Sequence, residues 1–124
     1  MSPLGLLFLA SDPVDILYND SRLQKLCTTH KDAKKKWGNN VADRLFQRIA
    51  DLSAAPNLFH AFRLPGKCHG LSDDLAGTYA MRLDGGWRFI FEPANDPVPV
   101  LPDGGIDVNK VTIIRIVSVE DYHP

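Results

Sequence analysis

The sequence predicts an α+β fold in which a helical hairpin packs on one face of a mainly antiparallel β-sheet. Two observations carry this prediction. Residues 21–55 place their apolar side chains at helical spacing, whereas the segments after Pro65 are rich in β-branched and aromatic residues. The chain has 124 residues, which is enough for one domain with a substantial core. Helices that precede a run of strands pack most easily by covering one side of the sheet.

The first half of the sequence predicts one strand and two helices. A short strand over residues 14–18 precedes the cluster Asn19-Asp20-Ser21, which is typical of a helix start. From Ser21 an apolar stripe runs to Trp37, and Gly38 can end that helix. A second helix begins at Asn39 or Asn40 and ends before Pro56. Two helices joined this tightly form an antiparallel hairpin.

The second half predicts four strands, over residues 67–71, 78–83, 87–91 and 112–119. The second and third of these form a hairpin about Asp84-Gly85-Gly86. The last strand is rich in β-branched residues and suits the centre of a sheet. A loop rich in proline and glycine fills residues 92–110, a length at which a function or a supporting structure is expected. The predicted order of elements is therefore β-α-α-β-β-β-β.

We expect a single domain over residues 14–124 and an N-terminal extension over residues 1–13. The apolar run Leu4–Ala10 lacks a basic leader and is too short to span a bilayer, so we expect neither a secretory signal nor a membrane segment. The extension could be an added strand, a partner-binding arm or residues from a start codon placed too far upstream. Cys27 and Cys68 form neither a metal-ligand pair nor a secreted disulfide framework, which favours a cytoplasmic protein.

Charge is unevenly distributed along the chain. The net charge is −1 and the isoelectric point is about 6.4, so there is no general attraction to nucleic acid. Basic residues nevertheless gather between residues 22 and 48, in the predicted helices. Such a surface can follow a phosphate backbone, and Lys34 and Lys35 are candidate substrate-binding residues on it. The alternative is a solvated helical face without a ligand.

The chain ends with three reactive side chains, Asp121, Tyr122 and His123, directly after the last predicted strand. A rigid strand would hold them at the rim of the sheet, and an imidazole there exchanges protons near neutral pH. Proton-transfer chemistry is one interpretation and a solvated tail is the other. If the strand is regular to its end, Asp121 and His123 share a face and Tyr122 points away. Tyr122 is then the weakest of the three candidates.

Four segments, in a fixed order along the chain, resemble a known family. They are Gly66-Lys67-Cys68-His69-Gly70-Leu71, Gly77-Thr78-Tyr79-Ala80-Met81-Arg82-Leu83, Gly86-Trp87-Arg88-Phe89-Ile90-Phe91-Glu92-Pro93 and Glu120-Asp121-Tyr122-His123. The sequence resembles the HigB-type killer proteins of the RelE/ParE superfamily, which are toxins of bacterial type II toxin-antitoxin modules. The resemblance runs from about Val14 to His123 and implies a RelE-like fold. Residues 103–107 resemble a longer hairpin insertion found in one branch of these proteins.

The resemblance implies a toxin that enters the ribosomal A site and cuts messenger RNA there. Metal-free RNA cleavage needs a base for the 2′-hydroxyl proton, an acid for the departing 5′-oxygen and a cation for the charge on phosphorus. His69, His123 and Arg88 supply these three kinds of group, and Asp121 could orient His123. Tyr122 could stack on a base or bond to a phosphate. The other expected substrate-binding residues are Lys67, Arg82, Lys34 and Lys35. The structural alternatives are an ion pair of Arg88 with a sheet carboxylate and a partly buried strand position for His69.

The partner that the resemblance implies is an antitoxin with a helix-turn-helix domain, of the HigA type, which holds the toxin inactive. The ribosome and messenger RNA are the other implied partners, and operator DNA would be contacted only through the antitoxin. No cofactor is implied. The two cysteines and four histidines lack the spacing of a zinc site, so we expect no metal.

The sequence departs from the family pattern after the His-x-Leu segment. Many ribosome-cutting members carry a lysine and further basic residues there, whereas this chain has Ser72, Asp73, Asp74, Leu75 and Ala76. Each lost phosphate contact weakens binding to ribosomal RNA. Two alternatives to a nuclease therefore stay open. One is a ParE-like toxin that inhibits by binding alone and needs no terminal histidine. The other is a weakened toxin that is retained to bind its antitoxin and co-repress their operon.

Overall fold

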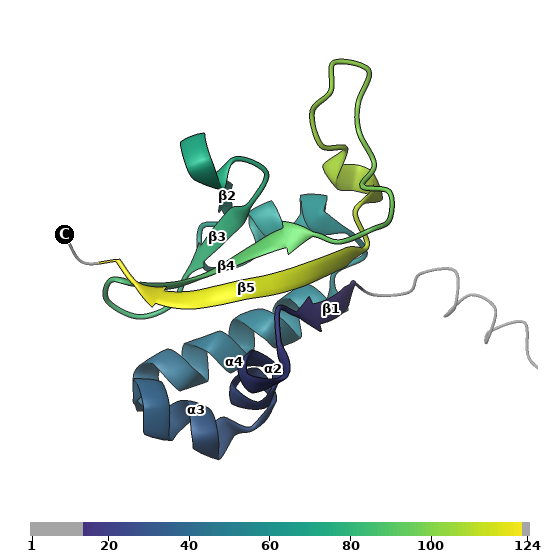
Figure 1. Ribbon diagram of the computed structural model, residues 1–124. Helices are drawn as coiled ribbons and strands as arrows, with labels where there is room; N and C mark the ends of the chain where they lie inside the picture. The colour runs from purple at the N-terminus through teal and green to yellow at the C-terminus, as the bar shows by residue number, and fades with distance from the viewer. Residues whose placement is uncertain (1–13, 123–124) are drawn as a thin grey trace, which may run out of the picture.

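The structure, a computed structural model, describes residues 14–122, and these form a sheet with helices on one side (Figure 1). The five-stranded sheet has the order β1-β5-β4-β3-β2. Strand β1 (Asp15–Tyr18) runs parallel to β5 (Ile113–Asp121), and the other neighbouring strands are antiparallel. The remaining strands are β2 (His69–Gly70), β3 (Tyr79–Arg82) and β4 (Trp87–Pro93). The predicted α+β class and mainly antiparallel sheet are confirmed. The predicted extension over residues 1–13 lies outside the described residues.

The helices α2 (Ser21–Thr28), α3 (His30–Trp37) and α4 (Asn39–Ala54) lie together below the sheet in Figure 1. The prediction of one continuous helix over residues 21–37 is wrong. Thr29 has an extended backbone, with φ −119° and ψ 100°, and this residue separates α2 from α3. Thr28 and Thr29 are β-branched and favour such a conformation over a helical one. No helix among residues 14–122 is long and apolar enough to cross a membrane.

The core lies between the helices and one face of the sheet. Phe89 and Phe91 of β4 and Ile114 and Ile116 of β5 are buried there against Leu45 of α4. Because side chains alternate along a strand, β4 directs its residues 88, 90 and 92 to the opposite face. This opposite face, which none of the α-helices in residues 14–122 covers, is called the open face below (Figure 1).

A β-bulge in β5 changes which of its side chains reach the open face. Ile90 pairs with Ser118, but its neighbour Phe91 pairs with Ile116, so that Val117 has no partner on β4. An extra residue of this kind reverses the facing of every side chain that follows it in the strand. The last residues of β5 therefore face the sides opposite to those that a regular strand would give them.

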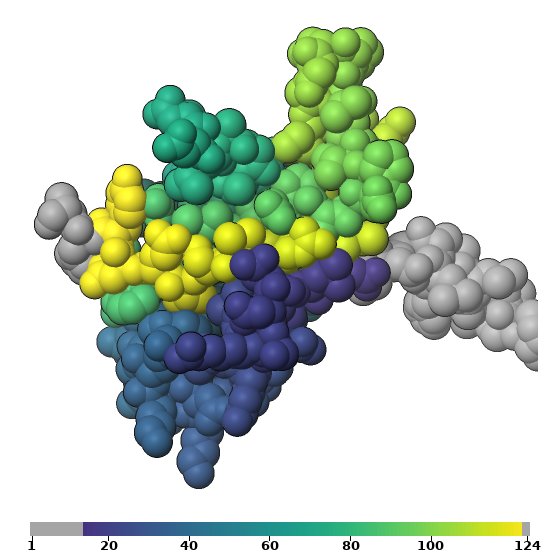
Figure 2. Space-filling model, viewed as in Figure 1, coloured from purple at the N-terminus to yellow at the C-terminus, as the bar shows by residue number. Residues whose placement is uncertain are grey.

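Two segments rise from the open side of the sheet and stand apart in Figure 2. One contains β2 and the short 3₁₀ helix η2 (Asp73–Leu75). The other is the long loop after β4, which forms a projecting arm closed by a bridge between Val100 and Ile106. Asn95 secures the base of this arm, because its side-chain oxygen accepts hydrogen bonds from the backbone N–H groups of Thr112 and Ile113 at 3.0 and 3.1 Å.

Burial of Cys27 and Cys68 makes the stability of the protein sensitive to alkaline pH. Burial raises the pKa of each thiol from 9.0 to about 12. A thiol with a raised folded-state pKa contributes stability below the unfolded value, and this contribution is lost as the pH rises from 9 towards 12. We expect the free energy of unfolding to fall by about 1 kcal/mol per pH unit for each thiol in that window. Urea unfolding between pH 8 and 10 measures this slope. The free energy of unfolding of the Cys27→Ala/Cys68→Ala variant should fall less steeply with pH, and equal slopes for the two proteins would contradict the prediction.

Candidate functional site

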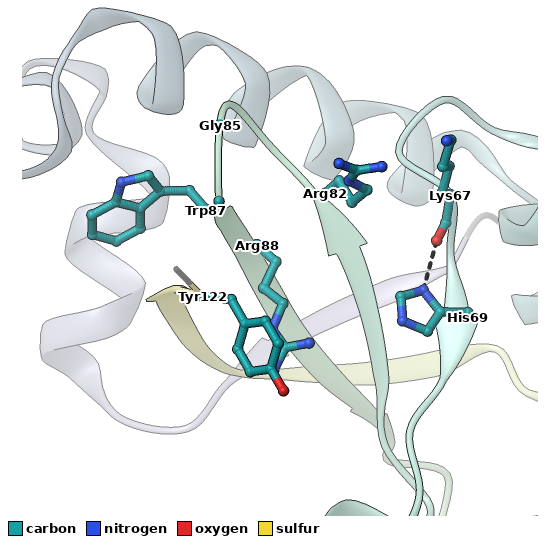
Figure 3. A pocket seen from close by; sticks show the side chains of 8 residues that line it. Lys67, His69, Arg82, Gly85, Trp87, Arg88 and Tyr122 are labelled. Carbon is teal, nitrogen blue, oxygen red and sulfur yellow. Dashed lines mark hydrogen bonds between the residues drawn. The ribbon is translucent and has the colours of Figure 1, made fainter. Parts of the chain in front are cut away.

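A pocket of about 400 Å³ opens on the open face of the sheet (Figure 3). Its lining brings together five of the residues that the sequence predicted, namely Lys67, His69, Arg82, Arg88 and Tyr122. The hairpin between β3 and β4 completes the lining with Gly85, Gly86 and Trp87. Residues from four separate segments of the chain therefore meet at one place, and the pocket is large enough for a small ligand.

The pocket is suited to an anion. Lys67, Arg82 and Arg88 are cations, and no carboxylate lies among the lining residues. Arg82 and Arg88 are direct partners in the register of β3 and β4. Like charges that face each other across two strands repel. An anionic ligand placed between them would therefore be bound more tightly, because it also relieves this repulsion.

Arg88 is held by an aromatic ring. Its guanidinium carbon lies 3.6 Å from the centroid of the Tyr122 ring, which is within the range of a cation–π contact. Figure 3 shows the two side chains overlapping, with the indole of Trp87 pointing away from them. Arg88 Nε is buried and has no hydrogen-bond partner within residues 14–122, and no ion pair joins Arg88 to a sheet carboxylate in that range. A buried N–H group without a partner costs stability, so the fold holds Arg88 here without fully satisfying its side chain.

Tyr122 reaches the pocket because of the bulge and because its backbone is fixed. Glu120 pairs with Arg88 across β5 and β4, so the alternation puts Tyr122 on the open face as well. The Tyr122 N–H also donates a hydrogen bond to the carbonyl of Gly86 at 2.7 Å. The expectation that Tyr122 points away from the site is therefore wrong, because it assumed a regular strand.

His69 is fixed in one orientation by its neighbour Lys67. The Nδ1 atom of His69 lies 2.9 Å from the Lys67 carbonyl oxygen. A carbonyl can only accept, so Nδ1 carries the hydrogen and Nε2 of the neutral imidazole carries the free lone pair. His69 is exposed and lines the same pocket as the Arg88 guanidinium. A neutral imidazole in this state can take a proton, and its protonated form can return one.

The turn that positions Lys67 depends on close packing beneath it. Gly66 and Lys67 both have positive φ, at 114° and 50°. The Gly66 carbonyl accepts a hydrogen bond from Arg82 N at 2.7 Å, and the buried Arg48 donates from Nε to the Arg82 carbonyl at 3.1 Å. Burial lowers the pKa of the Arg48 guanidinium, and the charge of Arg44 lowers it further. Arg48 thus links α4 to the strand that carries Arg82.

Three predicted site residues do not line this pocket. Lys34 and Lys35 lie on α3, in the helical layer on the other side of the sheet, so the structure does not bring them to this pocket, and their role in substrate binding stays a prediction. Lys35 instead lines a separate cleft with Arg22, Lys25 and Lys36. Asp121 pairs with Trp87 at the end of β5 and is exposed. His123 lies outside the described residues, and its catalytic role stays a prediction.

Cys68 is next to His69 in the chain but is not a reactive nucleophile. Its side chain is buried in the core, and burial raises the pKa of the thiol to about 12, so it is protonated at neutral pH. Within residues 14–122 no three His, Cys, Asp or Glu side chains are grouped so that they could hold a metal ion.

Sequence reasoning missed the stack of Arg88 on Tyr122 and the anchoring role of Gly86. The segment Asp84-Gly85-Gly86 indicated a hairpin, and this hairpin is confirmed. Nothing in the sequence, however, indicated that the backbone of Gly86 holds the last residue of the described chain. That contact depends on the register of β5, which only the folded sheet determines.

Comparisons with known proteins found similarity at the level of structure. No protein-family model matches the sequence, and no curated protein matches it significantly. The solved structures that match over 90% of this chain include a YoeB/ParE toxin from Agrobacterium tumefaciens, a YoeB dimer from Staphylococcus aureus and the RelBE2 toxin-antitoxin complex from Mycobacterium tuberculosis. Their sequence identities are 13%, 14% and 17%, their TM-scores are 0.55, 0.51 and 0.50, and 100%, 98% and 99% of their chains are covered. The described chain therefore has the fold of the RelE/ParE toxins.

Proposed function

We propose that this protein is the toxin of a type II toxin-antitoxin module and cuts messenger RNA on the ribosome by metal-free acid–base catalysis. The observation that carries the proposal is the pocket on the open face, where three cations surround an oriented imidazole. RNA brings a phosphodiester to such a site, and each phosphate contact with a cation adds affinity. The similarity of the fold to toxin structures supports the same conclusion.

The proposed reaction uses the groups as follows. A base removes the 2′-hydroxyl proton of the substrate, the 2′-oxygen attacks phosphorus, and the bond from phosphorus to the 5′-oxygen breaks. An acid gives a proton to that 5′-oxygen, so the products are a 2′,3′-cyclic phosphate and a free 5′-hydroxyl. His69 is suited to proton transfer through Nε2, because Nδ1 is already engaged with the Lys67 carbonyl. His123 is the proposed partner for the second proton, and Asp121 its orienting group.

The cations stabilise the charge that builds on the phosphate oxygens in the transition state. Arg88 is suited to this role, because it lines the pocket opposite its register partner Arg82 and its guanidinium carbon lies 3.6 Å from the centroid of the Tyr122 ring. Arg82 and Lys67 add charge from the neighbouring strand and turn. In this arrangement Tyr122 is a positioning residue for Arg88.

The proposal includes the partners and place of such a toxin. A cognate antitoxin with a helix-turn-helix domain, of the HigA type, would hold the protein inactive in the cytoplasm and connect it to operator DNA. The RelBE2 structure, which is itself a toxin-antitoxin complex, supports an antitoxin partner. Co-expression with the product of the neighbouring gene should yield a complex that withstands purification.

The test is growth arrest on induced expression without antitoxin, with cleavage of a reporter messenger RNA followed in parallel. We expect His123→Ala to lower cleavage at least about 100-fold at matched protein level, because general acid–base groups contribute factors of this size. His60→Ala is the matched control, since His60 is exposed and lies outside the pocket.

The outcomes of this test separate the three functions that the sequence left open. Arrest with transcript cuts that His123→Ala abolishes supports the nuclease. Arrest without cuts, or arrest that does not depend on His123, would overturn it in favour of a ParE-like binding toxin. No arrest by the wild-type protein would favour a weakened toxin kept for antitoxin binding and co-repression.

A further inference from the structure

A second pocket adjoins the first and shares its Arg88–Tyr122 pair. This second pocket has a volume of about 300 Å³. Its other lining residues are Leu71, Ser72, Asp73, Asp74 and Leu75. The charge therefore changes sign across Arg88 and Tyr122: the first pocket holds cations and no carboxylate, and the second holds two carboxylates. Two adjoining pockets of opposite character suit a ligand that has an anionic part and a part with hydrogen-bond donors.

The acidic turn has a defined conformation. Asp73 has a φ of 56°, and Ala76 N donates a hydrogen bond to the Asp73 carbonyl at 3.0 Å. Thr78 closes the turn, because both its backbone N–H and its hydroxyl donate to the Leu75 carbonyl, at 3.0 and 2.6 Å. The carboxylates of Asp73 and Asp74 are on exposed residues and make no side-chain hydrogen bond or ion pair within residues 14–122. They are therefore available to a ligand.

An ionised carboxylate repels phosphate and can only accept hydrogen bonds. In a nucleotide, the base edge is the part that can donate to it. Guanine presents two adjacent donors, N1–H and the N2 amino group, which match the two oxygens of one carboxylate. Uracil presents a single N–H between two carbonyl oxygens, and these oxygens would be repelled. A carboxylate at this position thus favours guanine and disfavours uracil.

Tyr122 supplies the surface on which such a base would stack. The Arg88 guanidinium covers part of the ring at 3.6 Å, yet Tyr122 is 64% exposed. Single-stranded RNA is commonly recognised by stacking an unpaired base on an aromatic ring or a guanidinium and by hydrogen bonds to its Watson–Crick edge. Both kinds of contact are available where the two pockets meet.

We propose that the pocket formed by Asp73, Asp74 and Tyr122 is a base-recognition site that selects guanine next to the phosphate held by Lys67, Arg82 and Arg88. The inference rests on the proposed function, because it assigns the sequence preference of the same RNA-binding site. It also gives the acidic residues at 73 and 74 a role that basic residues could not have. These two carboxylates weaken the binding of any phosphate, but they favour one base over another.

The test is an NMR titration of the full-length protein with guanosine and uridine monophosphates, each as the 3′ and the 5′ isomer, and with inorganic phosphate. We expect the guanosine nucleotide to bind about five- to tenfold more tightly than the uridine nucleotide, which is the lower end of what a bidentate base contact provides. Resonances of residues 72–75 should shift with guanosine nucleotides and not with inorganic phosphate.

The variant is Asp73→Asn/Asp74→Asn, since asparagine has nearly the same shape and tolerates the positive φ of residue 73. It should reduce the guanosine-to-uridine ratio to about one and tighten uridine binding, because the repulsion of phosphate is removed. Asp15→Asn is the matched control, because Asp15 is exposed on β1, at the other edge of the sheet from β2. It should leave the ratio unchanged.

Equal affinities for the two nucleotides, a ratio that survives in the double variant, or no nucleotide binding at all would overturn this inference. None of these results would by itself overturn the nuclease, which is tested by transcript cleavage in cells. Conversely, if the protein selects guanosine nucleotides but leaves transcripts intact, the proposed nuclease function is overturned and the base-recognition site stands.

Discussion

Replacing Arg88 with alanine is expected to lower the rate of messenger-RNA cleavage by about 100- to 1,000-fold, which is the usual loss when one donor to a developing negative charge is removed. Arg88 lies in the pocket beside Arg82 and Lys67, stacks on Tyr122 at 3.6 Å, and keeps a buried Nε without a partner in the described chain. No other side chain in the lining combines these three properties. The measurement is single-turnover cleavage of a message bound to purified ribosomes.

The control for this variant is Arg63→Ala. Arg63 also lies over an aromatic ring, with its guanidinium carbon 5.3 Å from the centroid of Phe59, but it lies outside the pocket. Removing it deletes a similar contact and one positive charge without touching the proposed site. A cleavage rate of Arg88→Ala within tenfold of the Arg63→Ala rate would contradict the role of Arg88.

Replacing Gly66 with alanine is expected to lower the free energy of unfolding by about 3 kcal/mol, because backbone strain and overpacking both oppose it. Gly66 has a φ of 114°, and an added Cβ would lie 2.6 Å from Arg48 Nε, 3.0 Å from Arg48 Cδ and 3.2 Å from Met81 Cε. Arg48 and Met81 are both buried, so neither can move aside freely. Any shift of Arg48 also lengthens its hydrogen bond to the Arg82 carbonyl. Urea unfolding at neutral pH gives the value.

Gly77→Ala separates the two causes. Gly77 has a φ of 89°, but nothing lies within 4 Å of a Cβ built on it. This variant carries the backbone strain alone and should cost about 1 kcal/mol. If Gly66→Ala lowers the free energy of unfolding no more than Gly77→Ala does, the close approach to Arg48 does not constrain the turn. The turn beneath His69 would then be less constrained than its geometry indicates.

Local patterns in the sequence were enough for most of the fold. Helical spacing predicted the position of α4, and Asp84-Gly85-Gly86 predicted the hairpin between β3 and β4. The break at Thr29 was not predicted, because the apolar stripe continues across it. Periodicity reports which side chains face the core, and it does not report a single residue with an extended backbone.

The candidate site was predicted in part. Lys67, His69, Arg82 and Arg88 were named from the sequence and line one pocket. Lys34 and Lys35 do not, although they belong to the most basic segment. Charge density along the chain does not say which layer a helix joins. That choice depends on the apolar face of the helix, and here this face directs α3 away from the open side of the sheet.

By itself the sequence determined the α+β class, the placing of a helical region between the first strand and the other four, and the chemical groups available for a site, because each of these follows from local spacing and residue type. Only the tertiary structure decided that Tyr122 joins Arg88 in the pocket. The reason is the unpaired Val117 in β5, since one extra residue in a strand reverses the facing of all that follow. Such a bulge arises from the pairing of β5 with β4. Pairing depends on both strands together, so the local pattern of residues in either strand alone does not predict it.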